Sequence, residues 1–264
     1  MQSWAPDTEA ASAPNFGVVI PARYGSTRLP GKPLRTIAGK PMILHVLESA
    51  RRSGAQFVWV ATDDVRIAEV VSEAGGTPVM TSGEHASGTD RVAEVVASQA
   101  LAAESIVVNL QGDEPLMPPG LLARVALNLH ERVDAGIATL ATPIKGEEDF
   151  LDHHSVKVVL ARDGRALYFS RTPIPHGTNR KVSPLLHVGL YAYRVGTLLR
   201  MAECGPVELE RAESLEQLRA LWLGIPIHVD VIAKLPGRGV DTEGDLSRVA
   251  EELERPNAHE VCLG

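Results

Sequence analysis

The chain has 264 residues, of which 44% are apolar, and a formal net charge of −7. This length allows one large α/β domain, or such a domain with a smaller lobe attached. The acidic balance argues against a nucleic-acid-binding protein, which needs a basic surface. No apolar run is long enough to cross a bilayer, which argues against a membrane protein.

The two ends of the chain give further indications. Residues 1–15 have neither the basic nor the apolar region of a signal peptide, and their Ala, Ser and Pro content predicts a flexible tail. The two cysteines, Cys204 and Cys262, are too few for a disulfide framework. We therefore expect a protein of the reducing cytoplasm.

The first half of the chain alternates β-rich apolar runs with segments of helical spacing. This alternation is typical of an α/β fold with a mostly parallel twisted sheet flanked by helices. We expect strands at residues 16–20, 57–61, 105–110 and 136–141, and helices at residues 42–53, 65–74, 91–102 and 121–130.

The pattern changes after residue 142, where antiparallel structure is expected. Two short runs around an Asp-Gly turn predict a hairpin of residues 156–160 and 166–170. The segments that follow are a loop at 172–184, a strand at 187–193, a helix at 209–223, a strand at 225–232 and a helix at 246–253. We therefore expect one α/β domain of residues 16–150 and 225–264, with a smaller antiparallel lobe of residues 151–224.

A basic segment follows the first expected strand. Residues 10–47 contain no Asp or Glu, but they include Arg23, Arg28 and Lys32. Ligands of open parallel sheets bind beyond the carboxyl ends of the strands, and clustered cations can neutralise a polyphosphate. The segment lacks the spacing of a Walker A loop and of a dinucleotide-binding glycine motif. Its position favours an anion site over a solvated basic loop.

Two carboxylates are candidate metal ligands. Asp113 ends an apolar strand in a Gly-Asp-Glu turn, and Mg²⁺ prefers one or two carboxylates together with substrate phosphates. Asp241 stands just before a helix whose start, at Thr242 and Asp245, resembles a capping box. By itself, each could have a purely structural role, Asp113 in a turn and Asp241 at the helix N-terminus.

Three further patterns could bind a ligand or be structural. Residues 87–91 begin a helix, where backbone N–H groups meet phosphate or simply receive a capping side chain. His187, Gly189 and Tyr191 alternate on one strand face, which leaves a hollow between two hydrogen-bonding side chains. Polar side chains at 210, 213 and 217 share one face of the expected helix, and Arg171 could pair with a substrate carboxylate or make a surface ion pair.

Taken together, these segments resemble the CMP-Kdo synthetases, that is, the 3-deoxy-manno-octulosonate cytidylyltransferases. The resemblance runs from about residue 16 to the final helix, and the order and spacing of the segments make it specific. They are IPARYGSTRLPGKPL, VATDD, SGTDRVAEV, VNLQGDEP, YFSR, HVGLYAYR, ESLEQLRALW and GVDTEGDL.

The resemblance implies transfer of CMP from CTP to the 2-hydroxyl of Kdo by a cytoplasmic, Mg²⁺-dependent homodimer that serves lipopolysaccharide biosynthesis. Residues 151–224 would then carry the sugar site and the dimer contacts. The implied catalytic residues are Arg23, Lys32, Asp113 and Asp241, the last two as metal ligands. The implied nucleotide site is Pro21, Ala22, Arg23, Arg28, Lys32, Ala61, Thr62, Asp63, Ser87, Gly88, Thr89, Arg91 and Gln111. The implied sugar site is Gln111, Arg171, His187, Tyr191, Glu210, Glu213 and Gln217.

Some positions depart from the family pattern. The loop at 172–186 is short, Leu186 stands where a basic residue is common, and Glu208 replaces a proline. These departures affect the sugar side, so 8-amino-Kdo or a nonulosonate stays open as the acceptor. A nucleotide-sugar glycosyltransferase is a second alternative, although its Asp-x-Asp motif is not evident. A non-catalytic nucleotide sensor is a third, which the retained carboxylates and Lys32 disfavour.

Overall fold

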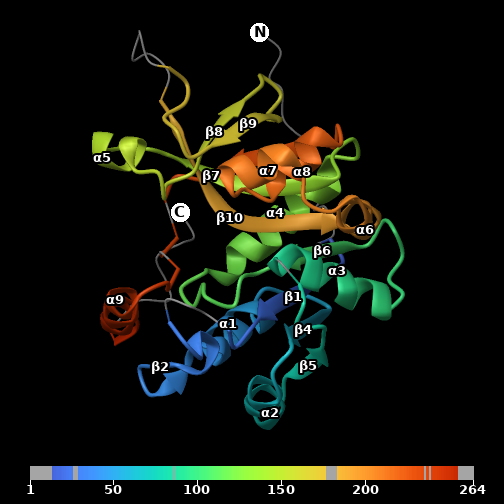
Figure 1. Ribbon diagram of the computed structural model, residues 1–264, viewed down its shortest axis with the longest axis vertical. Helices are drawn as coiled ribbons and strands as arrows, with labels where there is room; N and C mark the ends of the chain where they lie inside the picture. The colour runs from blue at the N-terminus through green and yellow to red at the C-terminus, as the bar shows by residue number, and fades with distance from the viewer. Residues whose placement is uncertain are drawn as a thin grey trace, which may run out of the picture.

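The computed structural model describes residues 14–25, 29–85, 87–176, 183–234, 236–237 and 239–254. One mixed sheet forms the centre of the molecule (Figure 1). Its main strands are β1 (Phe16–Ala22), β4 (Phe57–Thr62), β5 (Thr77–Met80), β6 (Ile106–Asn109), β7 (Ile137–Pro143), β10 (Leu185–Arg194) and β11 (Ile227–Val231). They lie in the order β11-β7-β10-β6-β1-β4-β5.

Most of these strands pair in parallel, as the alternating sequence pattern predicted. β1 lies between β4 and β6, β5 extends the sheet beyond β4, and β11 lies beside β7, all in parallel. β10 is the exception, because it runs antiparallel to both β6 and β7. Every residue of β1 is buried, which explains its continuous apolar sequence.

Helices cover both faces of the sheet. One face packs against α1 (Met42–Arg51), α2 (Val65–Glu73) and α4 (Pro119–Glu131), and the other against α3 (Gly88–Ser98) and α6 (Val195–Cys204). Alternate β1 side chains enter the two cores: Val18 and Ile20 join the first, and Val19 joins the second. The expected helices at 42–53, 65–74, 91–102 and 121–130 are confirmed, with ends shifted by a few residues.

Smaller elements surround this centre. η1 (Lys32–Leu34), β2 (Thr36–Ile37) and β3 (Lys40–Pro41) follow β1, and α9 (Glu243–Glu254) packs against β2. The predicted hairpin is confirmed as β8 (Lys157–Leu160) and β9 (Ala166–Ser170), with α5 (Glu147–Leu151) before it. Among the described residues, no helix is long and apolar enough to cross a membrane.

The antiparallel part is joined to the main sheet rather than separate from it. β8 pairs with β10, and β10 itself lies between β7 and β6. The expected lobe of residues 151–224 therefore includes a central strand of the main sheet. Sequence periodicity reports which faces of a strand are buried, but it does not report which strands become neighbours.

The single helix expected at 209–223 is wrong. Two short helices, α7 (Glu208–Glu213) and α8 (Gln217–Trp222), replace it. Ser214 between them adopts a left-handed conformation with φ of 53°. A left-handed residue cannot continue a right-handed helix, so the chain changes direction at that point.

Candidate functional site

The loops that follow β1 and β6 meet at one edge of the sheet. The two strands are parallel neighbours, with Val19 opposite Asn109, so their carboxyl ends lie together. The Gly112 N–H donates to the Pro21 carbonyl oxygen at 3.3 Å. A Cβ atom at Gly112 would lie 2.8 Å from that oxygen, so this close approach requires glycine. The basic segment and the Gly-Asp-Glu turn therefore lie side by side, as the sequence predicted.

Lys32 connects the two candidate metal ligands. Its Nζ atom donates to Asp113 Oδ2 at 2.5 Å, to Asp241 Oδ1 at 3.0 Å and to the Val240 carbonyl oxygen at 2.8 Å. Burial lowers the pKa of the ammonium, but the two carboxylates outweigh this effect and the pKa is raised. Oxygens from two distant segments thus converge on a single cationic atom.

The start of α9 holds Asp241 in place. The Asp245 carboxylate accepts from the backbone N–H groups of Asp241 at 3.0 Å and Thr242 at 2.8 Å. The Thr242 hydroxyl accepts in return from the Asp245 N–H at 3.2 Å. This reciprocal arrangement confirms the predicted capping box. The Val240 N–H also donates to the Asp113 carbonyl oxygen at 2.9 Å, which brings the two carboxylate-bearing segments together.

Glu114 is an acidic neighbour that the sequence reasoning did not single out. Burial raises the pKa of its carboxyl to about 8, and the charges of Asp113 and Asp241 add to this effect. A Cβ atom at Gly239 would lie 2.8 Å from Glu114 Oε1, so the Glu114 carboxylate lies directly against the backbone before Asp241. The only indication of Glu114 in the sequence was its position directly after Asp113.

These groups fit a divalent cation. Asp113 and Asp241 supply hard oxygen donors, which are the ligands that Mg²⁺ prefers. Their oxygens already converge on the Lys32 ammonium, so a cation can be shared by both carboxylates. Burial is the main cause of the raised pKa of Glu114, and the negative charges of Asp113 and Asp241 add to it, so acidic groups gather at this position.

A cavity of about 310 Å³ opens at this edge of the sheet. Most of the described residues predicted to bind nucleotide line it, together with both candidate metal ligands. The predicted residues in its wall are Pro21, Ala22, Arg23, Lys32, Ser87, Gly88, Arg91, Gln111, Asp113 and Asp241. His85 and Glu216 also line it, and neither was assigned a role from the sequence. His85 belongs to no recognisable local pattern, whereas Glu216 lies within the ESLEQLRALW segment.

Hydrogen bonds connect this wall to predicted nucleotide-site residues outside it. Arg91 is only 3% exposed, and its guanidinium donates to Asp63 Oδ2 at 3.0 Å and to the Thr81 hydroxyl. Burial raises the pKa of the Glu216 carboxyl. Hydrogen bonds from Thr89 and other groups lower it, but they only partly offset the effect of burial. Ala61, Thr62, Asp63 and Thr89 lie outside the cavity wall, and Arg28 lies outside the described residues.

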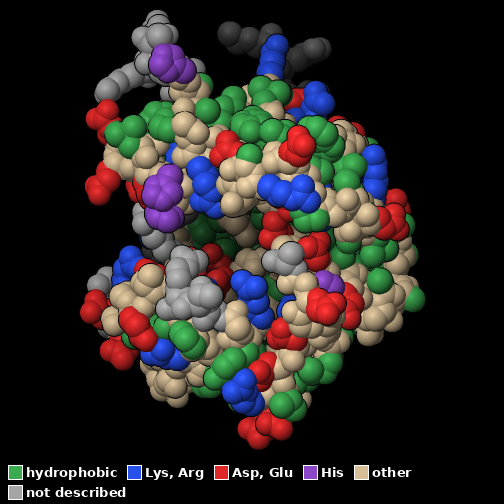
Figure 2. Space-filling model, in the orientation of Figure 1, with side chains coloured by type: hydrophobic (Ala, Val, Ile, Leu, Met, Phe, Trp, Pro, Cys, Tyr) green, Lys and Arg blue, Asp and Glu red, His purple; other side chains and the backbone are tan. Residues whose placement is uncertain are grey.

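A second cavity, of about 540 Å³, adjoins the first. Asp113 and Asp241 line both cavities. The second wall is completed by residues of β10, by the turn before β8 and by the segment before α9. Figure 2 shows the molecule hollowed between the part that carries β8, β9, α7 and α8 and the part that carries β1 and α1, with acidic and basic side chains around the hollow.

Of the residues predicted to bind the sugar, His187 is the one found in the lining of the second cavity among the described residues. Its ring lies 5.2 Å from the Tyr191 ring and 5.1 Å from the Phe169 ring, measured between centroids. The predicted common face of His187 and Tyr191 is therefore confirmed. Enclosure by protein lowers the pKa of His187 to about 3 and raises that of Tyr191, because burial disfavours the charged form of each ring. Both rings are therefore neutral hydrogen-bonding groups.

The structure places Arg171 and Glu213 against each other rather than in the second cavity wall. The Arg171 guanidinium donates to three carbonyl oxygens, those of Glu213 at 2.7 Å, His153 at 3.1 Å and Ser214 at 3.2 Å. The Glu213 carboxylate accepts from the Ser170 hydroxyl at 2.7 Å and from the Arg171 backbone N–H at 3.0 Å. In this arrangement both residues hold the break between α7 and α8 against β9.

Glu210 and Gln217 are buried, and Glu210 forms an internal ion pair. Arg219 binds the Glu210 carboxylate through two nitrogens, at 2.7 Å and 2.8 Å. A third donor of Arg219 bonds Asp90 Oδ1 at 3.0 Å, which links α8 to the 87–91 segment of the first cavity. The common face expected for positions 210, 213 and 217 is not formed, because it required one continuous helix.

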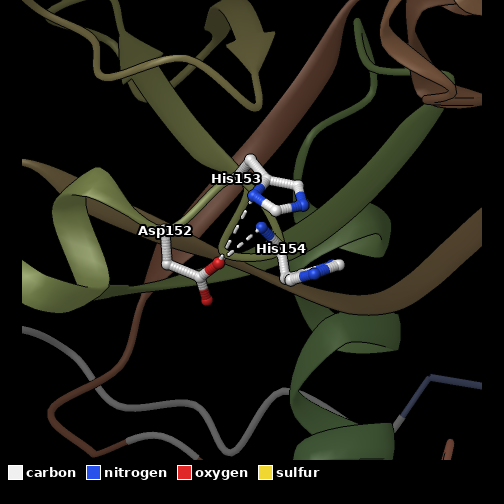
Figure 3. A group of neighbouring side chains, drawn as sticks. All are labelled: Asp152, His153 and His154. Carbon is white, nitrogen blue, oxygen red and sulfur yellow. Dashed lines mark hydrogen bonds and ion pairs between the residues drawn. The ribbon is translucent and has the colours of Figure 1, made fainter.

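His154, in the turn before β8, lines the second cavity. Figure 3 shows it with its neighbours Asp152 and His153. Asp152 Oδ1 accepts from the His154 backbone N–H at 2.9 Å and lies 4.0 Å from His153 Nδ1. Asp152, His153 and His154 present ligand atoms within 4.8 Å of one another. The Asp152 carboxylate also accepts from the Ser155 hydroxyl at 3.3 Å, so its observed contacts shape the turn.

Comparison with known proteins gives a consistent result. A family model described as cytidylyltransferase matches residues 17–227. A 3-deoxy-manno-octulosonate cytidylyltransferase of Hahella chejuensis is 53% identical over 244 residues, which are 89% of this chain and 96% of the relative. A protein of the same name from Idiomarina loihiensis is 52% identical over the same coverage of both chains.

Solved structures agree with these relatives. A CMP:2-keto-3-deoxy-manno-octonic acid synthetase complexed with CTP superposes with a TM-score of 0.85 and 44% identity, covering 91% of this chain and 98% of that one. A 4-diphosphocytidyl-2C-methyl-D-erythritol synthase of Anaerococcus prevotii has a TM-score of 0.60 at 15% identity, over 91% of this chain and 99% of that one. The second likeness supports the fold alone.

Proposed function

We propose that this chain, which belongs to the cytidylyltransferase family, transfers CMP from CTP to the 2-hydroxyl of Kdo and releases pyrophosphate. The relatives named for this reaction cover most of the chain, and a similar structure was solved with CTP. The product is an activated sugar for lipopolysaccharide biosynthesis. CTP binding is assigned to the first cavity and sugar binding to the second.

The observation that carries this proposal is the shared position of Asp113 and Asp241. Both carboxylates line the first cavity and the second. A nucleotidyl transfer must bring the α-phosphorus of the nucleotide next to the hydroxyl of the acceptor. Two adjoining cavities that share the proposed metal ligands support this juxtaposition, and catalysis would then consist of positioning and charge stabilisation.

The reaction forms one bond from the sugar 2-oxygen to the α-phosphorus and breaks the bond from that phosphorus to the pyrophosphate oxygen. The hydroxyl proton is lost to solvent. Lys32 and Arg23 supply positive charge in the first cavity, where charge develops on the departing pyrophosphate. Asp113 and Asp241 would hold Mg²⁺. When bound, this cation would lower the pKa of the attacking hydroxyl, so that no separate protein base is needed.

Three further properties stay predictions of the family resemblance. They are dependence on Mg²⁺, a homodimeric state and a cytoplasmic location. Leu167 in β9 and Trp222 in α8 are 59% and 58% exposed, and their elements pack together. We propose this exposed apolar pair as part of the contact between two copies.

Pyrophosphate release tests the proposed function. The wild-type protein is mixed with CTP and Mg²⁺, and Kdo, 8-amino-Kdo, N-acetylneuraminate and no acceptor are compared. We expect release with Kdo that EDTA abolishes. Release with another acceptor alone would keep the nucleotide chemistry and reject the sugar assignment. Absence of release with every acceptor would reject the enzyme assignment.

Variants of the two carboxylates test the cation site. We expect Asp113→Asn and Asp241→Asn each to lower kcat/KM by at least about 100-fold, because a charge that stabilises the transition state is lost. Asp134→Asn is the matched control, since Asp134 is exposed and lies outside both cavity walls. Near-normal turnover and Mg²⁺ dependence in Asp113→Asn would contradict the assignment.

A further inference from the structure

A buried hydroxyl lies behind the ring of His187. Thr139 belongs to β7 and is fully buried. Its Oγ1 atom lies 3.0 Å from His187 Nε2, 2.8 Å from the Leu190 carbonyl oxygen and 3.1 Å from the Val188 carbonyl oxygen. One oxygen thus contacts the cavity-lining histidine and two backbone groups of the strand that carries it.

The chemistry of these four groups fixes the direction of the hydrogen bonds. A threonine hydroxyl has one proton and can also accept, whereas a carbonyl oxygen can only accept. The proton of Thr139 is therefore shared with the carbonyl oxygens of Val188 and Leu190. The remaining lone pair of Oγ1 faces His187 Nε2, so Nε2 must carry a proton and donate.

The protonation state of the ring completes this argument. Enclosure lowers the pKa of His187 to about 3, so the ring is neutral near pH 7 and carries one proton only. With that proton on Nε2, Nδ1 keeps a lone pair. Among the described residues no group is found hydrogen-bonded to Nδ1, and His187 lines the second cavity. The ring therefore has a free acceptor and no free donor.

The same hydroxyl stabilises the local shape of β10. The pairing between β10 and β7 shifts register between Val188 and Tyr191, and Thr139 lies opposite Tyr191. This bulge contains Gly189, which also lines the second cavity. The two carbonyl oxygens bonded by Thr139 flank Gly189, so one residue holds both the bulge and the histidine ring.

We propose that Thr139 is a positioning residue that holds His187 as its Nε2–H tautomer, so that Nδ1 accepts a hydrogen bond from a hydroxyl of the acceptor substrate. This inference rests on the proposed function, which assigns the second cavity to a polyhydroxylated sugar acid. It specifies that His187 accepts, rather than donates, the hydrogen bond to the substrate. It also assigns a role to Thr139, which acts through His187 without touching the substrate.

The tautomer is measured on the wild-type protein without any sugar. In protein labelled with ¹⁵N in its histidines, the two-bond correlations between ring carbon-bound protons and ring nitrogens identify the protonated nitrogen. We expect His187 to be neutral with the proton on Nε2. A proton on Nδ1, or a charged ring at neutral pH, would overturn the proposal, and neither result depends on catalytic activity.

Two variants separate the hydroxyl from the shape of Thr139. Thr139→Val keeps the shape and removes the hydroxyl, whereas Thr139→Ser keeps the hydroxyl. We expect Thr139→Val to mix the tautomers of His187 and to raise the KM for Kdo about 10-fold, the effect of one hydrogen bond, with the KM for CTP unchanged. Thr139→Ser should keep the single tautomer and stay within about 2-fold of the wild-type KM values.

The outcomes distinguish positioning from a merely structural role. Equal changes in both KM values of Thr139→Val, with the tautomer unchanged, would show that Thr139 only maintains the sheet, and would overturn the proposal. An unchanged KM for Kdo would also overturn it. Failure of the proposed function would instead be seen as an absence of pyrophosphate release in the wild-type protein, while the tautomer would still be measurable.

Discussion

At the scale of single residues, the site consists of charged groups that the surrounding protein holds close together. Lys32 contacts Asp113 and Asp241 at once, and Glu114 beside them has a raised pKa. Such perturbed groups are typical of functional sites. The neutral ring of His187 is the counterpart in the second cavity, because burial suppresses its charge there.

His187 makes stability depend on pH in a predictable direction. Its pKa is about 3 in the folded protein and 6.5 for an exposed ring, so the unfolded chain binds a proton that the folded one excludes. The free energy of unfolding is therefore unaffected above pH 6.5 and falls as the pH decreases toward 3. We expect His187 to account for a loss of about 2 kcal/mol between pH 7 and pH 5.

Urea unfolding at pH 7 and pH 5 measures this effect. The His187→Gln variant should lose less stability over this interval than the wild-type protein, because it has no ring to protonate. His176→Gln is the matched control, since His176 is exposed, and it should behave like the wild type. Parallel losses in wild type and His187→Gln would contradict the prediction.

At the scale of elements, one buried arginine connects helices from different parts of the chain. Arg219 in α8 binds Glu210 in α7, Asp90 in α3 and the Met201 carbonyl oxygen in α6. Arg219 is 1% exposed and Glu210 is buried, whereas Asp90 is half-buried. The network therefore ties the helices of one sheet face to the segment that begins α3.

Replacing this arginine should strongly destabilise the protein. We expect Arg219→Met to lower the free energy of unfolding by about 3–5 kcal/mol, because Glu210 would keep a buried charge and Asp90 a half-buried one without their partner. Adding Glu210→Gln should recover part of that loss. Arg200→Met is the control on exposed surface and should change stability by less than about 0.5 kcal/mol. Urea unfolding of the wild type, Arg219→Met, Glu210→Gln and the double variant measures the coupling, and additive losses would contradict it.

At the scale of the whole molecule, the two cavities and the exposed apolar pair lie on different parts of the fold. Asp113 lines both cavities, whereas Leu167 and Trp222 are exposed on β9 and α8. Burying two large apolar side chains between copies would remove their surface from water, which favours association. Neither Leu167 nor Trp222 belongs to the lining of either cavity.

Replacing the exposed apolar side chains with charged ones tests the predicted dimer. We expect Leu167→Glu together with Trp222→Glu to convert the dimer to a monomer, because charges placed in an apolar interface lose their hydration. Light scattering measures the mass, and Val65→Glu is the control at an apolar side chain of similar exposure outside the 151–224 lobe. A wild-type monomer would contradict the dimer, and an unchanged dimer in the double variant would contradict this surface.

The features that could be predicted from the sequence were those that depend on residues close together in the chain. The strands and helices of the first half, the meeting of the 21–23 and 111–113 loops and the cap before α9 were all predictable. Each depends on local patterns: burial on both faces of a strand, the position of a loop after a strand, or hydrogen bonds within four residues. The expected reaction and its substrates came from the resemblance to a known family.

The sequence by itself therefore determined the fold class, the basic segment and the two carboxylates. Only the tertiary structure decided that Lys32 bridges those carboxylates, that β10 lies inside the main sheet, that Glu210 pairs with Arg219 and that Thr139 supports His187. Each of these contacts joins segments far apart in the chain. Strand order and the left-handed residue Ser214 create them, and neither leaves a periodic signal in the residues that meet.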